Sequence, residues 1–277
     1  RRPAPLILGH EAAGVIVGGD MDGRRVTVNP LVTCGSCHAC KAGRENLCPE
    51  REIISMMPRQ GAFAQYISMP DRNLVTVPDE VPLAKAALAE PLAVSWHTVR
   101  LALEALHPSM DRKALVIGGG AIGLAAALAL KAMGVDNVII AEPNDVRRAY
   151  LTKTCGQTCV AKANGMFPVV IDAAGYAATR AVASERAMPG GVIGHVGLGE
   201  DTGGVDIRRL TLQEITFIGT YTYTAEDFRD TAAAIFDGRL GTLDWTETRG
   251  LNEGQSAFED LRAGTVAAPK IVLAPWS

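Results

Sequence analysis

The sequence lacks the features that mark nucleic-acid-binding, membrane-spanning or secreted proteins. Its 277 residues hold 27 Lys and Arg against 30 Asp and Glu, with no basic stripe, so no nucleic acid and no membrane surface is expected as a partner. The longest apolar stretch, around AIGLAAALALKAM, is interrupted by Lys131 and is too short to span a bilayer. Nothing resembles a signal peptide, and no internal repeat appears. We therefore expect a cytoplasmic protein with a small-molecule partner.

Cysteine is also scarce, and four of the six cysteines lie in one short segment, CGSCHACKAGRENLC. Cys34, Cys37, Cys40 and Cys48 form a C-x2-C-x2-C-x7-C pattern, which is typical of a loop closed around a tetrahedral zinc with no open position. Two disulfides are the alternative, but six cysteines in a chain of this length are not a small secreted framework. The pattern predicts a structural zinc. The two remaining cysteines, Cys155 and Cys159, are interpreted as small buried hydrophobic residues.

A dinucleotide-binding pattern occupies the middle of the chain. The strand-like KALVIGG is followed by GGGAIG, a helical stretch to Gly134, and a second strand-like run, NVIIA. Glycines in G-x-G-x-x-G register allow a tight turn and a close approach to a pyrophosphate at a helix N-terminus. The predicted cofactor-binding residues here are Gly118, Gly120, Ala121, Ile122, Gly123, Glu142 and Arg147. The carboxylate of Glu142 favours NAD over NADP, because it would repel a 2′-phosphate.

Near the start of the chain, LGHEAAGVIVGG places His10 beside Glu11. Such a pair alone is more often found at a surface than at a metal. The order of the motifs is more informative: GHE-x2-G, the four-cysteine segment ending in GRENLCP, AEPLAVSWHTV, and the glycine-rich fingerprint. In this order, through nearly the whole chain, the sequence resembles the zinc-dependent medium-chain dehydrogenase/reductase family, within it the sorbitol (polyol) dehydrogenase-like branch.

The resemblance implies a second, catalytic zinc and further cofactor contacts. His10, Glu11 and Glu90 match the family's catalytic positions as ligands or near neighbours of that zinc. Glu90 can equally be a carboxylate favoured by a helix N-terminus. Further implied cofactor-binding residues are Ala173, Ala174, Val196, Gly197, Leu198, Tyr221 and Lys270, although a plain surface lysine is an equal interpretation of Lys270.

The implied activity is oxidation of a secondary alcohol, a polyol or sugar alcohol with or without a phosphate, to a ketone, with hydride transfer to NAD. A threonine or simple alcohol dehydrogenase of the same fold is one alternative. A non-catalytic dinucleotide-binding protein that retains only the structural zinc is the other. The family's first catalytic ligand, a cysteine ahead of GHE, has no counterpart after Arg1. The resemblance also implies a homo-oligomer, a dimer or a tetramer.

The expected fold class is α/β. Residues 1–93, completed by 241–277, are expected to form a GroES-like β domain with the zinc loop, and 94–240 a doubly wound Rossmann domain. Expected strands in the first part include GRRVTVNP, AFAQYISM and NLVTVP. One connection conflicts with this fold, because only a few residues separate the strand-like TCVAK from FPVVID, too few for a helical crossover. Either the connection is remodelled, or residues are missing near 162–166, which is the interpretation we favour.

Overall fold

The computed structural model describes residues 3–276, which divide into two compact units. The first unit holds the described residues up to Ala93, Thr222–Val266 and the segment from Lys270 onward; the second holds Val94–Tyr221 and Ala267–Pro269. The predicted domains differ from these units in residues 222–240, which group here with the first unit, and in residues 267–269, which group with the second. A compact unit is not necessarily a domain that folds on its own, so the predicted domain boundaries stay a prediction.

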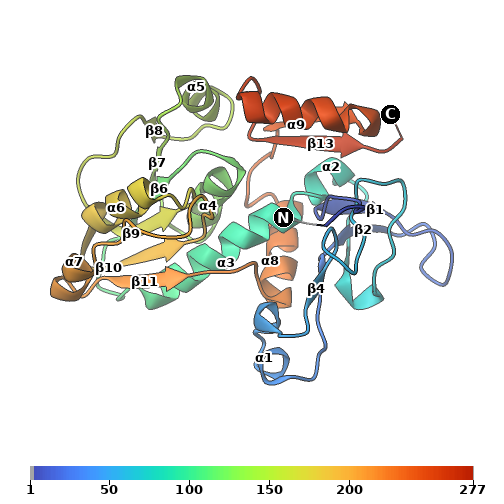
Figure 1. The fold of residues 1–277 in the computed structure, drawn as a ribbon, viewed down its shortest axis with the longest axis horizontal. Coiled ribbons are helices and arrows are strands. Elements are labelled where there is room, and N and C mark those ends of the chain that lie inside the picture. Colours follow the sequence, from blue (N-terminus) through green and yellow to red (C-terminus); the bar gives the residue numbers. More distant parts are fainter. Residues whose placement is uncertain (1–2, 277) are drawn as a thin grey trace. The chain divides into compact units, whose positions relative to one another are not determined.

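The first unit combines short β-strands with helices (Figure 1). Its elements up to the boundary are β1 (Ala12–Val15), β2 (Arg25–Val28), β3 (Leu31–Val32), α1 (His38–Lys41), η1 (Glu45–Leu47), β4 (Glu52–Ile53), η2 (Asp71–Asn73), β5 (Leu74–Thr76), α2 (Leu83–Ala86) and the start of α3 (Ala89–Ala105). Strands β1, β2 and β5 form an antiparallel sheet in that order, and β3 pairs with β4. The predicted strands in GRRVTVNP and NLVTVP are confirmed as β2 and β5.

The expected strand in AFAQYISM was wrong. Residues 62–69 form bends and irregular structure. The backbone N–H groups of Ala62 and Phe63 donate to the carbonyls of Gly9 and Leu8. Gly9 has a φ of +89°, outside the extended region, so these bonds do not continue into a ladder. None of its side chains is fully buried, and Tyr66, which is largely exposed, packs edge-on against Trp276.

The later part of the first unit adds α8 (Ala225–Phe236), β12 (Thr246–Gly250), η3 (Leu251–Glu253), α9 (Gly254–Ala263) and β13 (Lys270–Ala274). Strands β12 and β13 pair in parallel, and α9 connects them and lies along them (Figure 1). The sequence TAED has capping-box spacing, and the box forms at the start of α8, where Thr224 and Asp227 exchange side-chain and backbone hydrogen bonds.

The second unit is a doubly wound parallel sheet. Its elements after α3 are β6 (Lys113–Ile117), α4 (Ala121–Ala132), β7 (Asn137–Ala141), α5 (Asp145–Lys153), β8 (Cys159–Val160), β9 (Phe167–Asp172), α6 (Ala177–Arg186), β10 (Ala187–His195), α7 (Ile207–Leu212) and β11 (Thr216–Gly219). The strand order is β11-β10-β9-β6-β7-β8, and every pair is parallel. In order of appearance this is 3-2-1-4-5-6 read from the β8 edge, the dinucleotide-binding order.

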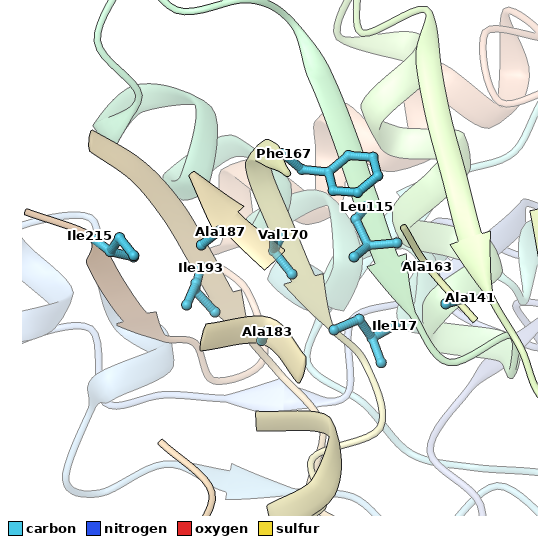
Figure 2. Close-up of a cluster of buried hydrophobic side chains, with 10 residues drawn as sticks. All are labelled: Leu115, Ile117, Ala141, Ala163, Phe167, Val170, Ala183, Ala187, Ile193 and Ile215. Carbon is cyan, nitrogen blue, oxygen red and sulfur yellow. The ribbon is translucent and has the colours of Figure 1, made fainter. Parts of the chain in front are cut away.

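Alternation along the strands supplies one core on each face of this sheet. Successive side chains of a strand point to opposite faces, and Val116 faces the glycine of α4, Gly123. The opposite face carries a buried cluster in which Leu115 packs with Val170 and with Ala183 of α6 (Figure 2). Helices α4 and α6 therefore cover different faces. Both faces of β9 are apolar and fully buried, which explains its continuous hydrophobic sequence.

The connection that conflicted with the expected fold runs from β8 to β9 without a helix. These strands are not neighbours, because β7 and β6 lie between them. The pairing register puts Val160 level with Asp172, so the chain must cross three strand spacings, about 14 Å, and return about 17 Å along β9. The straight-line distance is then about 22 Å, and the seven residue steps from Val160 to Phe167 span about 23–25 Å when fully extended.

Residues 161–166 close the gap without a helix, with bends at 161, 162 and 165 and a positive φ at Gly165. Ala163, in the middle of this segment, is 3% exposed and contributes to the core cluster where a crossover helix would otherwise pack. Lys113 extends its ammonium group over the ring of the buried Phe167, 4.8 Å from the ring centroid. The remodelled connection is thus the one in the structure, and the favoured explanation of missing residues stays a prediction.

Candidate active site and metal centres

The four-cysteine loop brings its thiols together. Cys37 caps α1, so its sulfur accepts from the N–H of Cys40 at 3.5 Å, and the sulfur of Cys34 accepts from the N–H of Cys37 at 3.4 Å. The sulfur of Cys34 lies 3.9 Å from that of Cys40 and 3.6 Å from that of Cys48. Sulfurs at the corners of a zinc tetrahedron with 2.3 Å bonds are about 3.8 Å apart. All six cysteines are free thiols, which excludes the disulfide alternative in this structure.

The thiols of this loop differ in their pKa values. Hydrogen bonds from the backbone of Ser36 and Cys37 lower the pKa of Cys34 to about 6. Burial and a hydrogen bond with Cys37 raise the pKa of Cys40 to about 12. A cation among the four sulfurs would favour the thiolate at every position, because the metal ligand is the deprotonated form. The donor set, its spacing and its closed geometry fit a structural zinc.

A second group able to hold a metal consists of His10, Glu11 and Glu90, whose ligand atoms lie within 4.8 Å of one another. His10 and Glu11 precede β1, and Glu90 lies in the first turn of α3. All three belong to the first compact unit. An imidazole and two carboxylates are a donor set that suits zinc with a position left open. The sequence thus supplies residues 80 positions apart that the fold brings to one place.

Glu90 is the most strongly perturbed member of this group. Its side chain is buried, and burial together with the negative charge of Glu11 raises the pKa of Glu90 to about 8. Tyr223 partly opposes this shift by donating its hydroxyl to Oε1 of Glu90 at 2.9 Å. Lys270 also opposes it, and its ammonium group pairs with the carboxylate of Glu11. A buried carboxyl whose charged form needs a cation is typical of a functional site.

Lys270 and Tyr223 have roles in this group that the sequence did not predict. Lys270, predicted near the cofactor, forms its ion pair with Glu11, so the structure gives it a place in the metal group, and its cofactor role stays a prediction. Tyr223 was not predicted at all. It lies 133 positions from Glu90, and YTYT offers no signal that distinguishes the buried second tyrosine from Tyr221, which is 38% exposed.

The glycine-rich turn has the backbone that its pattern predicts. Gly118 has a φ of +98°, which favours glycine, and a Cβ on Gly123 would lie 1.8 Å from the carbonyl oxygen of Gly118. Gly120 forms the N-cap of α4, and space is open around its Cα. The N-terminus of α4, with Ala121 and Ile122 in its first turn, is therefore accessible to an anion.

Glu142 lies at the end of β7 beside this turn. One carboxylate oxygen accepts from the N–H of Gly119 at 2.9 Å and the other from the N–H of Asn144 at 2.8 Å. Arg147 approaches the same carboxylate at 3.4 Å. Gly119 was missed as a functional position: a Cβ there would lie 2.6 Å from Leu151 and 3.0 Å from the carboxylate. The run of three glycines, one more than the pattern needs, is the signal that identifies it.

The predicted residues at the ends of β9 and β10 form two loops in backbone contact. The N–H groups of Val196 and Gly197 both donate to the carbonyl of Asp172, ahead of Ala173 and Ala174. A Cβ on Gly197 would lie 2.3 Å from the carbonyl carbon of Ala174, so the loops leave no room for a side chain. The next residue, Leu198, is 92% exposed and presents its side chain to solvent.

A buried arginine that the sequence analysis missed holds these loops. Arg180 of α6 is 6% exposed and donates to four carbonyls: those of Gly175, Glu200, Thr202 and Gly203. Nearby, Nε2 of His195 lies 3.7 Å from the carboxylate of Asp172. In sequence, TRAVASER reads as an ordinary helix face. Only the loop that folds over α6 shows why this position carries an arginine.

Comparison with known proteins identifies the class. Residues 1–79 match the alcohol dehydrogenase GroES-like domain, and residues 121–237 match the zinc-binding dehydrogenase domain. Together with the four-cysteine loop and the parallel sheet, these matches define a GroES-like domain joined to a Rossmann domain, which confirms the predicted fold class. The chain belongs to the zinc-dependent medium-chain alcohol dehydrogenase family, and it is a zinc-binding dehydrogenase.

Individual relatives are consistent with the predicted branch. The chain is 29% identical over 284 residues to the probable D-xylulose reductase A of Neosartorya fischeri, an alignment that covers 94% of this chain and 78% of the relative. It is 42% identical over 149 residues to the sorbitol dehydrogenase of Bacillus subtilis, covering 52% and 41%. Among solved structures, L-idonate 5-dehydrogenase of Escherichia coli superposes with a TM-score of 0.87 at 23% identity, covering 98% and 82%, a likeness in fold.

Between residues 3 and 276, no helix has the length and apolar character needed to cross a membrane.

Proposed function

We propose that this protein oxidises a secondary alcohol of the polyol or sugar-alcohol type to a ketone, with NAD as hydride acceptor and a zinc ion held by His10, Glu11 and Glu90. The observation that carries this proposal is the convergence of these three side chains, with ligand atoms within 4.8 Å of one another, in a chain of the zinc-binding dehydrogenase family. The reaction removes a hydride from carbon and a proton from the hydroxyl group.

Each residue would have a distinct task. When bound, the zinc supplies Lewis-acid polarisation of the alcohol oxygen, and NAD accepts the hydride. His10 would offer a neutral imidazole nitrogen, while Glu11 and Glu90 balance the positive charge of the ion. Lys270 neutralises Glu11, and Tyr223 orients the carboxylate of Glu90 through its hydroxyl. The four cysteines hold the structural zinc and take no part in the reaction.

The cofactor would bind across the glycine-rich turn, with Gly118, Gly120 and Gly123 at the pyrophosphate and Glu142 at the adenosine ribose. Both oxygens of Glu142 already accept backbone N–H groups, which fixes the carboxylate at the end of β7. A fixed negative charge accepts ribose hydroxyls and repels a 2′-phosphate, which supports NAD over NADP. Arg147 neutralises part of this charge, so the preference is expected to be finite.

The substrate class rests on the relatives named D-xylulose reductase and sorbitol dehydrogenase. The first experiment is therefore a substrate panel. NADH formation by the full-length protein should be followed with polyols, sugar-alcohol phosphates and simple secondary alcohols, each with and without a zinc chelator. We expect chelator-sensitive turnover of one class, and higher kcat/KM with NAD than with NADP. Sedimentation of the same preparation would test the proposed homodimer or homotetramer.

The matched variants are His10→Ala and His107→Ala. Loss of the His10 imidazole should abolish turnover and leave NADH binding nearly unchanged, because the glycine-rich turn belongs to the other compact unit. His107 is exposed and its ring contacts only the neighbouring Ser109 among the hydrogen bonds of this region, so its removal should have no effect. Full activity of His10→Ala would refute the zinc assignment. If the protein binds NADH but turns over no substrate of the panel, a non-catalytic dinucleotide-binding protein would be favoured.

A further inference from the structure

The carboxylate of Glu90 is held by a residue from a distant part of the chain. Tyr223 is 1% exposed, and its hydroxyl donates to Glu90 at 2.9 Å. The Tyr223 ring packs against that of Phe228, with centroids 5.7 Å apart. The preceding residue, Thr222, has a φ of 47°, a left-handed conformation that threonine rarely adopts. Such a conformation persists only where the surrounding structure holds it.

The start of α8 is what holds Tyr223 in place. Thr224, the next residue, caps this helix, and its backbone and hydroxyl both donate to the carboxylate of Asp227. Asp227 is 1% exposed, so this cap is a buried, charge-assisted structure. Tyr223 directly precedes this cap, so the position of the α8 N-terminus determines the position of Tyr223.

That N-terminus is in turn bound to the four-cysteine loop. Glu45, which lies between Cys40 and Cys48, accepts the N–H of Ala225, the first residue of α8, at 2.9 Å. Glu45 is fixed within the loop, because its own carbonyl accepts the N–H of Cys48 at 3.0 Å. Two hydrogen bonds, joined by the backbone from Tyr223 to Ala225, thus connect a residue between two zinc-binding cysteines to the carboxylate of Glu90, entirely within the first compact unit.

We propose that Tyr223 and Glu45 are positioning residues for the catalytic metal site: the four-cysteine loop sets the start of α8 through Glu45, and Tyr223 at that start orients Glu90. The four-cysteine loop, although its thiols take no part in the reaction, therefore also determines the geometry of a catalytic ligand. This inference rests on the proposed role of Glu90.

The first test compares Tyr223→Phe with Tyr66→Phe in the full-length protein. Tyr223→Phe keeps the packing against Phe228 and removes only the hydroxyl. Loss of an outer partner of a metal ligand should reduce both kcat and the affinity of the weaker-held zinc by roughly 10- to 100-fold. The readouts are kcat, the KM for NAD, and the chelator concentration that removes the first zinc from each chain. Tyr66 is 67% exposed, and its variant should match the wild type in all three.

The second test interrupts the bond between the loop and α8 from either side. Glu45→Ala removes the acceptor, and Ala225→Pro removes the donor at a first helical position, where proline fits. Each should lower kcat and ease removal of the weaker-held zinc by about three- to tenfold, and the double variant should add nothing further, because both changes remove one bond. Glu45→Gln should restore the wild-type values, and Glu50→Ala, an exposed residue two positions after Cys48, should leave them unchanged.

The outcomes separate this inference from the proposed function. If Glu90→Ala loses activity but Tyr223→Phe behaves as Tyr66→Phe does, the positioning role is refuted and the zinc assignment stands. If Tyr223→Phe has its effect but Ala225→Pro has none, while melting normally, the link to the four-cysteine loop is refuted. If Glu90→Ala itself remains fully active, the proposed function fails.

Discussion

The buried carboxyl of Glu90 should make the stability of the zinc-free protein fall as pH rises. Burial raises its pKa from 4.5 to about 8. Below pH 4.5 the group is protonated in both the folded and the unfolded chain. Between pH 4.5 and about 8 the unfolded chain loses this proton while the folded chain retains it, so each pH unit lowers the free energy of unfolding. Above about 8 this contribution is constant.

The magnitude follows from the two pKa values. At 1.36 kcal/mol for each pH unit, the difference between 4.5 and about 8 corresponds to about 5 kcal/mol, an upper limit because water that enters the opened site would reduce it. The assay is urea unfolding of the zinc-free protein at several pH values between 5 and 8.5, for the wild type and for Glu90→Gln. The glutamine can still accept the Tyr223 hydroxyl but does not ionise, so the difference between the two proteins isolates the contribution of Glu90.

We expect Glu90→Gln to gain stability over the wild type as pH rises, by up to about 5 kcal/mol. In the zinc-loaded protein the same difference should shrink or reverse, because a cation stabilises the carboxylate. A constant difference between the two zinc-free proteins across this pH range would show that Glu90 ionises normally, and the argument from burial would then be refuted.

Two further predictions concern the glycine-rich turn and the four-cysteine loop. Gly123→Ala would place a Cβ 1.8 Å from the oxygen of Gly118, so we expect a lower melting temperature and loss of NADH binding; Gly120→Ala, with nothing within 4 Å, should melt as the wild type does, and equal melting of the two variants would contradict the packing argument. Cys37→Ser should lose about one zinc per chain and lower the melting temperature, whereas Cys155→Ser should retain the full zinc content by colorimetric assay; equal zinc in both would refute the four-thiolate site.

Local chemistry made much of the fold predictable. The glycine-rich register and the strands in GRRVTVNP and NLVTVP depend on residues close in sequence, and each appears in the structure where it was expected. The prediction of a strand in AFAQYISM failed. Its apolar pattern is that of a β-strand, but the backbone that it pairs with, at residues 8 and 9, includes a glycine with positive φ. The β8–β9 connection could not be predicted, because the rule for connections between parallel strands assumes that the strands are neighbours and that a helix joins them. These two strands are not neighbours, and no helix joins them.

The sequence by itself determined which chemistry is present: four thiols within 15 residues, a glycine-rich turn followed by an acidic residue, and an imidazole beside a carboxylate. Spacing suffices for these groups because a short loop or turn can bring its own members together. Only the tertiary structure decided that Tyr223 and Lys270 join Glu90 and Glu11, and that Glu45 connects the cysteine loop to α8. These contacts join residues from 133 to 259 positions apart, and burial, which sets the pKa of Glu90, exists only in the folded chain.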